Sequence, residues 1–219
     1  MEIHPYRDFY ILDDGEVREF LFLDQERALL VDTGFPGTPL RETVRQITPL
    51  IPQVLLTHGD MDHTGALSSF PACYVHPADQ PLISGGPPCQ PLMAGDRFCI
   101  GTYCFEVLAL PGHTPGSIAL LDRAQKLLLS GDSIQKGPIY MFGAHRSLPL
   151  YIDSLRRLGQ DRAAIDCILP SHHAYPLSAS YIDYCLEDAL ALQRGQLTGT
   201  PHPTLPCRVY DGRHVQFYA

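Results

Sequence analysis

The sequence predicts an α/β fold, a layered sandwich of sheets and helices in one domain. Short apolar runs separated by charged turns fill the first third of the chain, a pattern typical of a β-meander. Segments of helical composition follow, and the longest spans residues 179–196. No internal repeat and no linker-like stretch divides the 219 residues, a length that suits a single domain. We therefore expect one domain over residues 1–219.

The expected elements follow in chain order. Strands are predicted at FYILDD, VREFLFLDQ and RALLVDTGF, then a helix over residues 38–47, the buried strand VLLTH, a small helix over residues 64–70 and the strand ACYVHP. Residues 84–95 (SGGPPCQPLMAG) are rich in Gly and Pro and are predicted to be loop. FCIGTYCFEVLALPGH, SIALLDRAQKLLLSGD and DCILPSHH indicate further strands, with a hairpin around Asp122–Gln125. LPLYIDSLRRLG and ASYIDYCLEDALALQRGQ are predicted helices, and Asp211-Gly212 marks a final hairpin.

Composition and charge narrow the classes of partner. Hydrophobic residues make up 45% of the chain and charged residues 18%, values ordinary for a globular protein. The net charge of −8 and the lack of a basic run argue against nucleic-acid binding. Seven scattered cysteines form no C-x-x-C pair, so we expect a reducing compartment, with most cysteines acting as small buried hydrophobic residues. No signal peptide and no membrane span are predicted, so we expect a cytoplasmic protein with no membrane partner.

Potential metal ligands gather where predicted strands end. The segment LLTHGDMDHTGAL carries His58, Asp60, Asp62 and His63 within six positions. Later strand ends carry His113 in VLALPGHTPGS, Asp132 in LLLSGDS, and His172 and His173 in CILPSHH. Each residue taken singly is explained as an ordinary turn residue. The set, with imidazole and carboxylate donors but no cysteine in these turns, predicts a pair of zinc, iron or manganese ions.

In this order, THGDMDHTG, PGHTPGS, SGDS and PSHH resemble the motifs of the metallo-β-lactamase-fold hydrolases. The signature of that family is T-H-x-H-x-D-H-x-G, followed by a later histidine, a bridging aspartate and a final histidine. The early VDTG segment, Asp32–Gly34 with the preceding valine, resembles the family's lead-in strand and turn. The resemblance covers about Val31 to His172 and is strongest to the small glyoxalase-II-like branch. It implies a four-layer αββα sandwich with the metal ions at one edge of the two sheets.

The resemblance also implies a role for each ligand position. His58 and His113 are similar to ligands of the first metal, and Asp60 stands where the second histidine of that site is usual. The second metal is implied to bind Asp62, His63 and His172, with Asp132 as the bridge. His172 is preferred to His173 because PSHH aligns with the family's P-G-H-G. Asp62, which would also orient the nucleophile, and Asp132 are the candidate catalytic residues.

Asp60 departs from the family pattern. A carboxylate adds negative charge and a harder donor than imidazole, which favours iron or manganese over zinc. Three outcomes are open: a dinuclear site with iron or mixed metals, a single metal in the second site, or an inactive site. We prefer the first. The carboxylate at this position also resembles the flavodiiron oxidoreductases, which have a glutamate at the equivalent position.

The expected activity is hydrolysis of an acyl ester or thioester of a small molecule by a metal-bound hydroxide. The alternative is a non-haem di-iron oxidoreductase related to the flavodiiron or sulfur dioxygenase branches. A non-enzymatic metal-binding or partner-binding domain is a third reading, and a homodimer is left open. Asp32 is interpreted either as support for a ligating histidine or as a turn cap. Tyr140 is interpreted either as a hydrogen-bond partner of the substrate near Asp132 or as an ordinary buried aromatic. His145 is a candidate to line the substrate pocket, and the fold alone does not choose the substrate.

Overall fold

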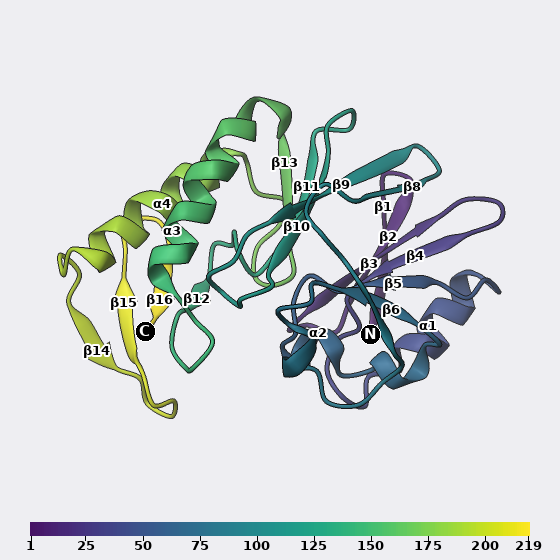
Figure 1. Ribbon diagram of the computed structural model, residues 1–219, viewed down its shortest axis with the longest axis horizontal. Coiled ribbons are helices and arrows are strands. Elements are labelled where there is room, and N and C mark those ends of the chain that lie inside the picture. Colours follow the sequence, from purple (N-terminus) through teal and green to yellow (C-terminus); the bar gives the residue numbers. More distant parts are fainter. The chain divides into compact units, whose positions relative to one another are not determined.

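The computed structural model describes residues 1–219 as two compact units, Met1–Val107 and Leu108–Ala219. Figure 1 labels the elements of both units. Each unit has its own buried hydrophobic cluster. Neither unit contains a helix with the length and apolar character that crossing a membrane requires.

Unit 1 is built on a seven-stranded sheet whose strands follow one another in sequence order. The first four strands pair antiparallel, which confirms the predicted meander, and β5, β6 and β7 then add in parallel. The strands are β1 (Glu2–Tyr6), β2 (Phe9–Asp13), β3 (Arg18–Leu23), β4 (Ala28–Val31), β5 (Gln53–Leu55), β6 (Cys73–Val75) and β7 (Cys89–Pro91). The parallel strands matter for the site, because their carboxyl ends meet at one edge of the sheet.

The helices of unit 1 are short. They are α1 (Leu40–Ile47), α2 (Met61–Thr64), and the 3-10 turns η1 (Leu67–Ser69) and η2 (Gln80–Leu82). Helix α1 confirms the predicted helix and buries Leu40 and Val44 against the sheet. The single small helix expected over residues 64–70 is wrong: helical structure begins at Met61, and a separate 3-10 turn follows. The earlier start arises because the N–H of His63 and the hydroxyl of Thr64 both donate to the carbonyl of Asp60.

Two predictions for unit 1 are corrected. Residues 84–95 contain a strand and are not loop throughout, and four cysteines form disulfides instead of acting as small buried hydrophobic residues. Strand β7 lies inside the segment predicted to be loop, where it pairs in parallel with β6 and opposes Cys89 to Cys73. In the hairpin of β8 (Arg97–Ile100) and β9 (Tyr103–Ala109), Cys99 stands opposite Cys104 and forms the second disulfide. Four of the seven cysteines are therefore paired. Strand register brought each pair together, and the cysteine pattern gives no support to a reducing compartment.

Unit 2 combines two sets of strands with two helices. Strands β10 (Ile118–Asp122) and β11 (Leu127–Gly131) form an antiparallel hairpin, and β13 (Cys167–Pro170) lies parallel to β11. A four-stranded sheet has the order β12 (Pro138–Tyr140), β16 (Gln216–Tyr218), β15 (Arg208–Asp211) and β14 (Gly199–Pro201). The predicted hairpins are confirmed, since Asp122 pairs with Leu127 and Asp211 pairs with Gln216.

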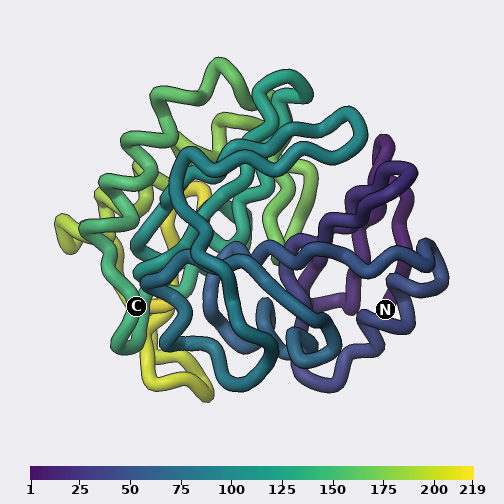
Figure 2. The backbone as a smooth tube through the Cα atoms, turned by 45° about the vertical axis from the view of Figure 1, so that its right-hand side comes forward, coloured from purple at the N-terminus to yellow at the C-terminus, as the bar shows by residue number.

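The helices of unit 2 cover its core. Helix α3 (Leu148–Leu158) continues into the 3-10 turn η3 (Gly159–Ala164), and α4 (Ser180–Gln193) packs against α3. Both helices contribute to one buried cluster that also contains residues of β10, β11, β12, β13 and β16. The C-terminal strands, yellow in Figure 2, return to these green helices. The helices predicted near residues 148–159 and 179–196 are thus confirmed.

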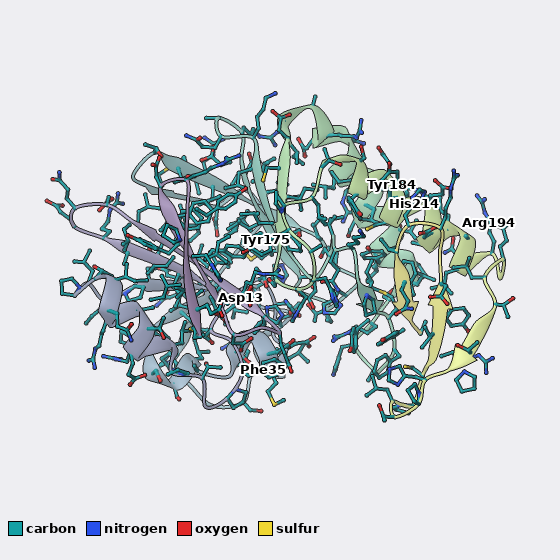
Figure 3. All side chains as sticks on the ribbon, turned by 180° about the vertical axis from the view of Figure 1, so that it is seen from behind. Asp13, Phe35, Tyr175, Tyr184, Arg194 and His214 are labelled. Atoms are coloured by element: carbon teal, nitrogen blue, oxygen red, sulfur yellow. A yellow bond between two sulfur atoms is a disulfide. The ribbon has the colours of Figure 1, made fainter.

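The turn between β15 and β16 is fastened to α4. The carboxylate of Asp188 accepts the backbone N–H groups of Arg213, His214 and Val215 at 2.7 to 2.9 Å. The ring of Tyr184 stacks on His214 with centroids 4.0 Å apart and an interplanar angle of 8° (Figure 3). A buried carboxylate that satisfies three backbone donors explains why an aspartate is tolerated on the buried side of this helix.

Candidate metal centre

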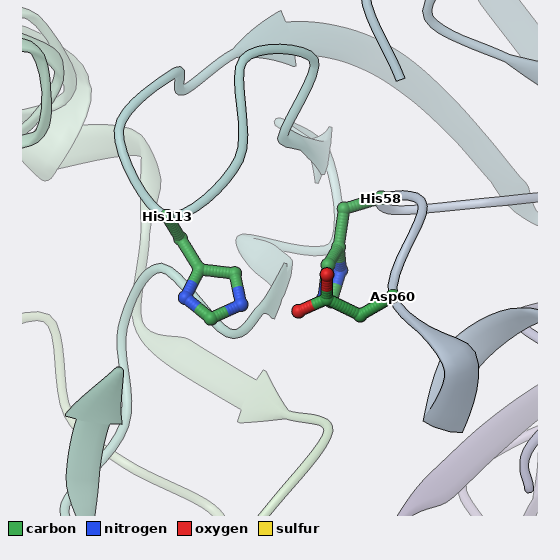
Figure 4. A group of neighbouring side chains, drawn as sticks. All are labelled: His58, Asp60 and His113. Atoms are coloured by element: carbon green, nitrogen blue, oxygen red, sulfur yellow. The ribbon is translucent and has the colours of Figure 1, made fainter. Parts of the chain in front are cut away.

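In unit 1, four predicted ligands lie in the turn after β5 and in the short helix α2. Figure 4 shows the side chains of His58 and Asp60 close together in this turn. The Nε2 atom of His58 lies 3.4 Å from Oδ2 of Asp60, and Nε2 of His63 lies 3.7 Å from Oδ2 of Asp62. The two imidazole rings are buried, with centroids 3.9 Å apart, while both carboxylates are partly exposed. The structure thus brings all four unit 1 residues to one edge of the sheet.

The opposite ring nitrogens of these histidines are engaged by the protein. Nδ1 of His58 lies 3.0 Å from the Thr57 hydroxyl, and Nδ1 of His63 lies 2.9 Å from Oδ2 of Asp32. Asp32 also accepts the backbone N–H of Thr57 at 2.7 Å and its hydroxyl at 2.8 Å. Such partners of Nδ1 fix the ring and leave Nε2 as the lone-pair donor for a metal. The contact with His63 favours the supporting role of Asp32 over that of a simple turn cap.

The backbone of this turn explains features of the motif. Asp60 occupies the N-cap position of α2, yet its carboxylate makes no capping hydrogen bond, so helix capping does not account for it. Gly59 donates its N–H to the buried Asp79, and a Cβ at position 59 would lie 2.8 Å from Cβ of Leu82. Gly65 lies directly on the backbone of Pro36, which leaves no space for a side chain. The glycines therefore let the ligand turn lie close against neighbouring segments.

In unit 2, the remaining three predicted ligands come together. His113 lies in the loop after β9, Asp132 directly after β11, and His172 two residues after β13. Nε2 of His113 lies 3.6 Å from Oδ2 of Asp132, and Nε2 of His172 lies 3.4 Å from the same oxygen. Nδ1 of His113 lies 3.1 Å from the carbonyl oxygen of Tyr140. Figure 4 shows the His113 imidazole extending from its loop.

These separations suit a metal site better than direct hydrogen bonds. The four nitrogen–oxygen distances of 3.4 to 3.7 Å lie beyond good hydrogen-bond length. Two ligand atoms bound at about 2.1 Å to one ion with tetrahedral angles are about 3.4 Å apart. Each of the seven predicted ligands is a His or Asp side chain that could bind a metal ion. Imidazole nitrogens and carboxylate oxygens without thiolate suit zinc, iron or manganese, so the donor set fits a divalent metal.

His172 and His173 have different surroundings. His172 faces Asp132 within unit 2, whereas His173 has a positive φ of 60° and its ring covers Gly137 so closely that a Cβ there would overlap the ring. Of the two histidines, His172 is the one that lies beside Asp132, and it stays the predicted ligand. His145 lies exposed on the segment after β12.

Two residues near the ligands were missed in the sequence. Thr57 joins Asp32 to His58, and its position just before the first histidine of the motif was the available signal. Glu19 of β3 is fully buried, with Oε1 against Gly34, where a Cβ would lie 2.5 Å away. Burial, followed by the charges of Asp14 and Asp32, raises the pKa of Glu19 well above its usual value. The segment REFLFL gave no signal that Glu19 is buried. Residues 18 to 22 are all buried, so the strand lacks the alternation of buried and exposed positions that could have placed Glu19.

Comparison with known proteins identifies the family. The profile of the Metallo-beta-lactamase superfamily matches residues 19–76 and 103–172, more than half of the chain. The chain therefore belongs to the metallo-β-lactamase superfamily. Its structural neighbours include a metallo-beta-lactamase from Pontibacter korlensis, with a TM-score of 0.73, 20% identity, and coverage of 86% of this chain and 98% of that one. The α/β fold class and the family resemblance are confirmed.

Several relatives have named activities. The chain is 26% identical over 213 residues to the acyl-coenzyme A thioesterase MBLAC2 of Gallus gallus, covering 74% of this chain and 77% of the relative. It is 34% identical over 129 residues to a hydroxyacylglutathione hydrolase of Bdellovibrio bacteriovorus, covering 57% and 50%. The protein TTHA1623, solved in a di-iron-bound form, is 29% identical with a TM-score of 0.62, covering 78% of this chain and 94% of that chain.

Proposed function

We propose that this protein is a metal-dependent hydrolase that cleaves an acyl ester or thioester of a small molecule. The observation that carries the proposal is the common orientation of three histidines. His58, His63 and His113 each have Nδ1 against a protein oxygen and Nε2 toward a carboxylate. Relatives named as an acyl-coenzyme A thioesterase and a hydroxyacylglutathione hydrolase support acyl transfer to water as the reaction class.

The proposed ligand set keeps the assignment that the family motif implies. In that assignment, one ion would be held by His58, Asp60 and His113, and a second by Asp62, His63 and His172. Asp132 would be a ligand shared by both. When bound, two divalent ions would supply a hydroxide nucleophile at neutral pH and polarise the carbonyl oxygen under attack.

The chain's own residues have separate tasks in this proposal. Asp62 keeps a partly exposed carboxylate on α2, where it can accept a hydrogen bond from the attacking water and orient it. Asp132 is nearly buried and supplies negative charge close to His113 and His172. Asp32 accepts the Nδ1 proton of His63, which selects the tautomer whose Nε2 donates to a metal.

Asp60 supports a second candidate, a non-haem di-iron oxidoreductase. Its carboxylate is a harder donor than the imidazole usual at this position, which favours iron or manganese. The di-iron form of TTHA1623 shows that a relative with 29% identity binds iron. Both candidates use the same ligands, so the metal and the reaction must be measured together.

The test combines elemental analysis with turnover. Protein purified without added metal is analysed for zinc, iron and manganese per chain, and is then assayed for thiol release from acyl-coenzyme A and S-acylglutathione, with and without oxygen. Thiol release that is lost in Asp62→Asn and Asp132→Asn, but kept in the exposed control Asp166→Asn, supports the hydrolase. Oxygen consumption without thiol release supports the oxidoreductase. Failure to bind any metal after reconstitution refutes both.

A further inference from the structure

Helix α3 is bonded to the loop that carries His113. The backbone N–H of Ser147, at the start of the helix, donates to the carbonyl of Gly112 at 2.8 Å. Seven residues further along, the hydroxyl of Ser154 donates to the carbonyl of Pro111 at 2.7 Å. The two residues that precede His113 are therefore both fixed to α3, so the helix determines where this imidazole lies.

The contact between Gly112 and Tyr151 leaves no gap between loop and helix. Gly112 has a φ of 143°, and a Cβ at this position would lie 2.5 Å from Cβ of Tyr151 and closer still to its N and Cα atoms. Real Cβ atoms do not approach other atoms this closely, so only glycine fits here. The His113 loop thus lies directly on the backbone of Tyr151.

The same residue contacts the loop that carries Asp132. The hydroxyl of Tyr151 donates to the carbonyl of Ser133 at 2.8 Å, and the tyrosine is fully buried. Burial raises the pKa of Tyr151 well above its usual range, which keeps this hydroxyl protonated as a donor. From α4, the thiol of Cys185 lies 3.9 Å from the carbonyl of Gln135, further along the same loop. Ser133 follows Asp132 directly, so the tyrosine hydroxyl acts one residue from the carboxylate.

We infer that Tyr151 is a positioning residue that sets the separation of His113 and Asp132, its backbone lying under one loop and its hydroxyl holding the other. The inference rests on the proposed function for its consequence, namely metal binding. A phenylalanine would fill nearly the same space in the core but would lose the hydroxyl, with its bond to Ser133 and its interaction with the Cys185 thiol. Metal–ligand distances tolerate deviations of only about 0.2 Å, so a small shift of either loop weakens binding.

The test uses Tyr151→Phe with Co²⁺ as the probe. We expect Co²⁺ affinity, measured by chelator competition, to fall about tenfold, as is typical when an outer support of a metal site is lost. The visible absorption of the bound Co²⁺ should also change, because its ligand geometry changes. The matched control is Ile182→Val, which removes one buried methylene from α4 and leaves both loop contacts intact. It should lose stability but keep both the affinity and the spectrum.

Hydrogen exchange of the metal-free protein separates this inference from the proposed function. Tyr151→Phe should speed amide exchange in residues 111–117 and 131–135 together, whereas Ile182→Val should not do so selectively. Affinity within twofold of wild type, an unchanged spectrum and unchanged loop exchange would overturn the positioning role. If the wild type binds no Co²⁺ but the loops of Tyr151→Phe exchange faster, the positioning role stands and the proposed function fails.

Discussion

The approach of Gly112 to helix α3 makes Gly112→Ala the sharpest test of how the His113 loop is held. A Cβ at this position overlaps the backbone of Tyr151, which cannot rotate away as a side chain could. Overpacking against well-packed neighbours costs about 1–3 kcal/mol, and a strained backbone conformation costs a further 1–3 kcal/mol or so. We expect a total loss of about 4 kcal/mol in the free energy of unfolding. For a chain of this size, that lowers the melting temperature by about 8–16 °C.

The assay is thermal unfolding of metal-free protein, with Gly143→Ala as the control. Gly143 also has a positive φ, 98°, but a Cβ there meets nothing within 4 Å. The control therefore carries the backbone strain without the contact, and the difference between the two variants measures the contact with Tyr151. Melting temperatures of the two variants that agree within about 2 °C, less than 1 kcal/mol at this size, would show that the backbone of Tyr151 does not exclude a side chain at position 112.

Three further predictions concern the buried carboxyl of Glu19, the metal preference set by Asp60 and the hydrogen bonds accepted by Asp188. Burial raises the pKa of Glu19 above its value in the unfolded chain, about 4.5, so the wild type loses stability as the pH rises above that value. The stability of Glu19→Gln relative to the wild type should therefore increase between pH 5 and pH 8. Urea unfolding at both pH values measures this increase, which should be about 1.4 kcal/mol for each unit by which the folded pKa lies above 5, up to pH 8. An equal stability difference between the two proteins at both pH values would contradict this prediction. Asp60→His should raise the zinc-to-iron ratio of the purified protein in elemental analysis, and an unchanged ratio would show that Asp60 binds no metal. Asp188→Ala should lose about 3 kcal/mol in urea unfolding because three backbone N–H groups lose their acceptor, whereas the exposed Asp166→Ala should change little.

Much of the secondary structure could be read from local patterns. The hairpins at Asp122 and Asp211 carry their own turn residues, and the helix from Leu148 has its N-cap at Ser147 and a periodic apolar face. The small helix at Met61 was misplaced because its start depends on bonds to the Asp60 carbonyl rather than on residue preference. Strand β7 was missed because Gly and Pro dominate its surroundings, and pairing with β6 overrides that local preference.

The residues that could bind metal can be read from the amino-acid sequence. Four potential ligands lie within six positions, so the end of one strand and one turn of helix are enough to bring them together. Their spacing therefore predicts the cluster of His58, Asp60, Asp62 and His63. The family motif extended the set to the later strand ends. Such information is local or carried in a motif, and it does not depend on how distant segments pack.

The contacts that hold these residues in place come from the packing of segments distant in the sequence. Asp32 meets His63 across 31 positions, and Tyr151 reaches Ser133 across 18. The two cysteine pairs follow from strand register, and the burial of Glu19 follows from packing around β3. These contacts depend on register and close packing between segments distant in sequence, which leave no periodic or spacing signal in the chain. The residues of the site are therefore a property of the sequence, and their geometry is a property of the fold.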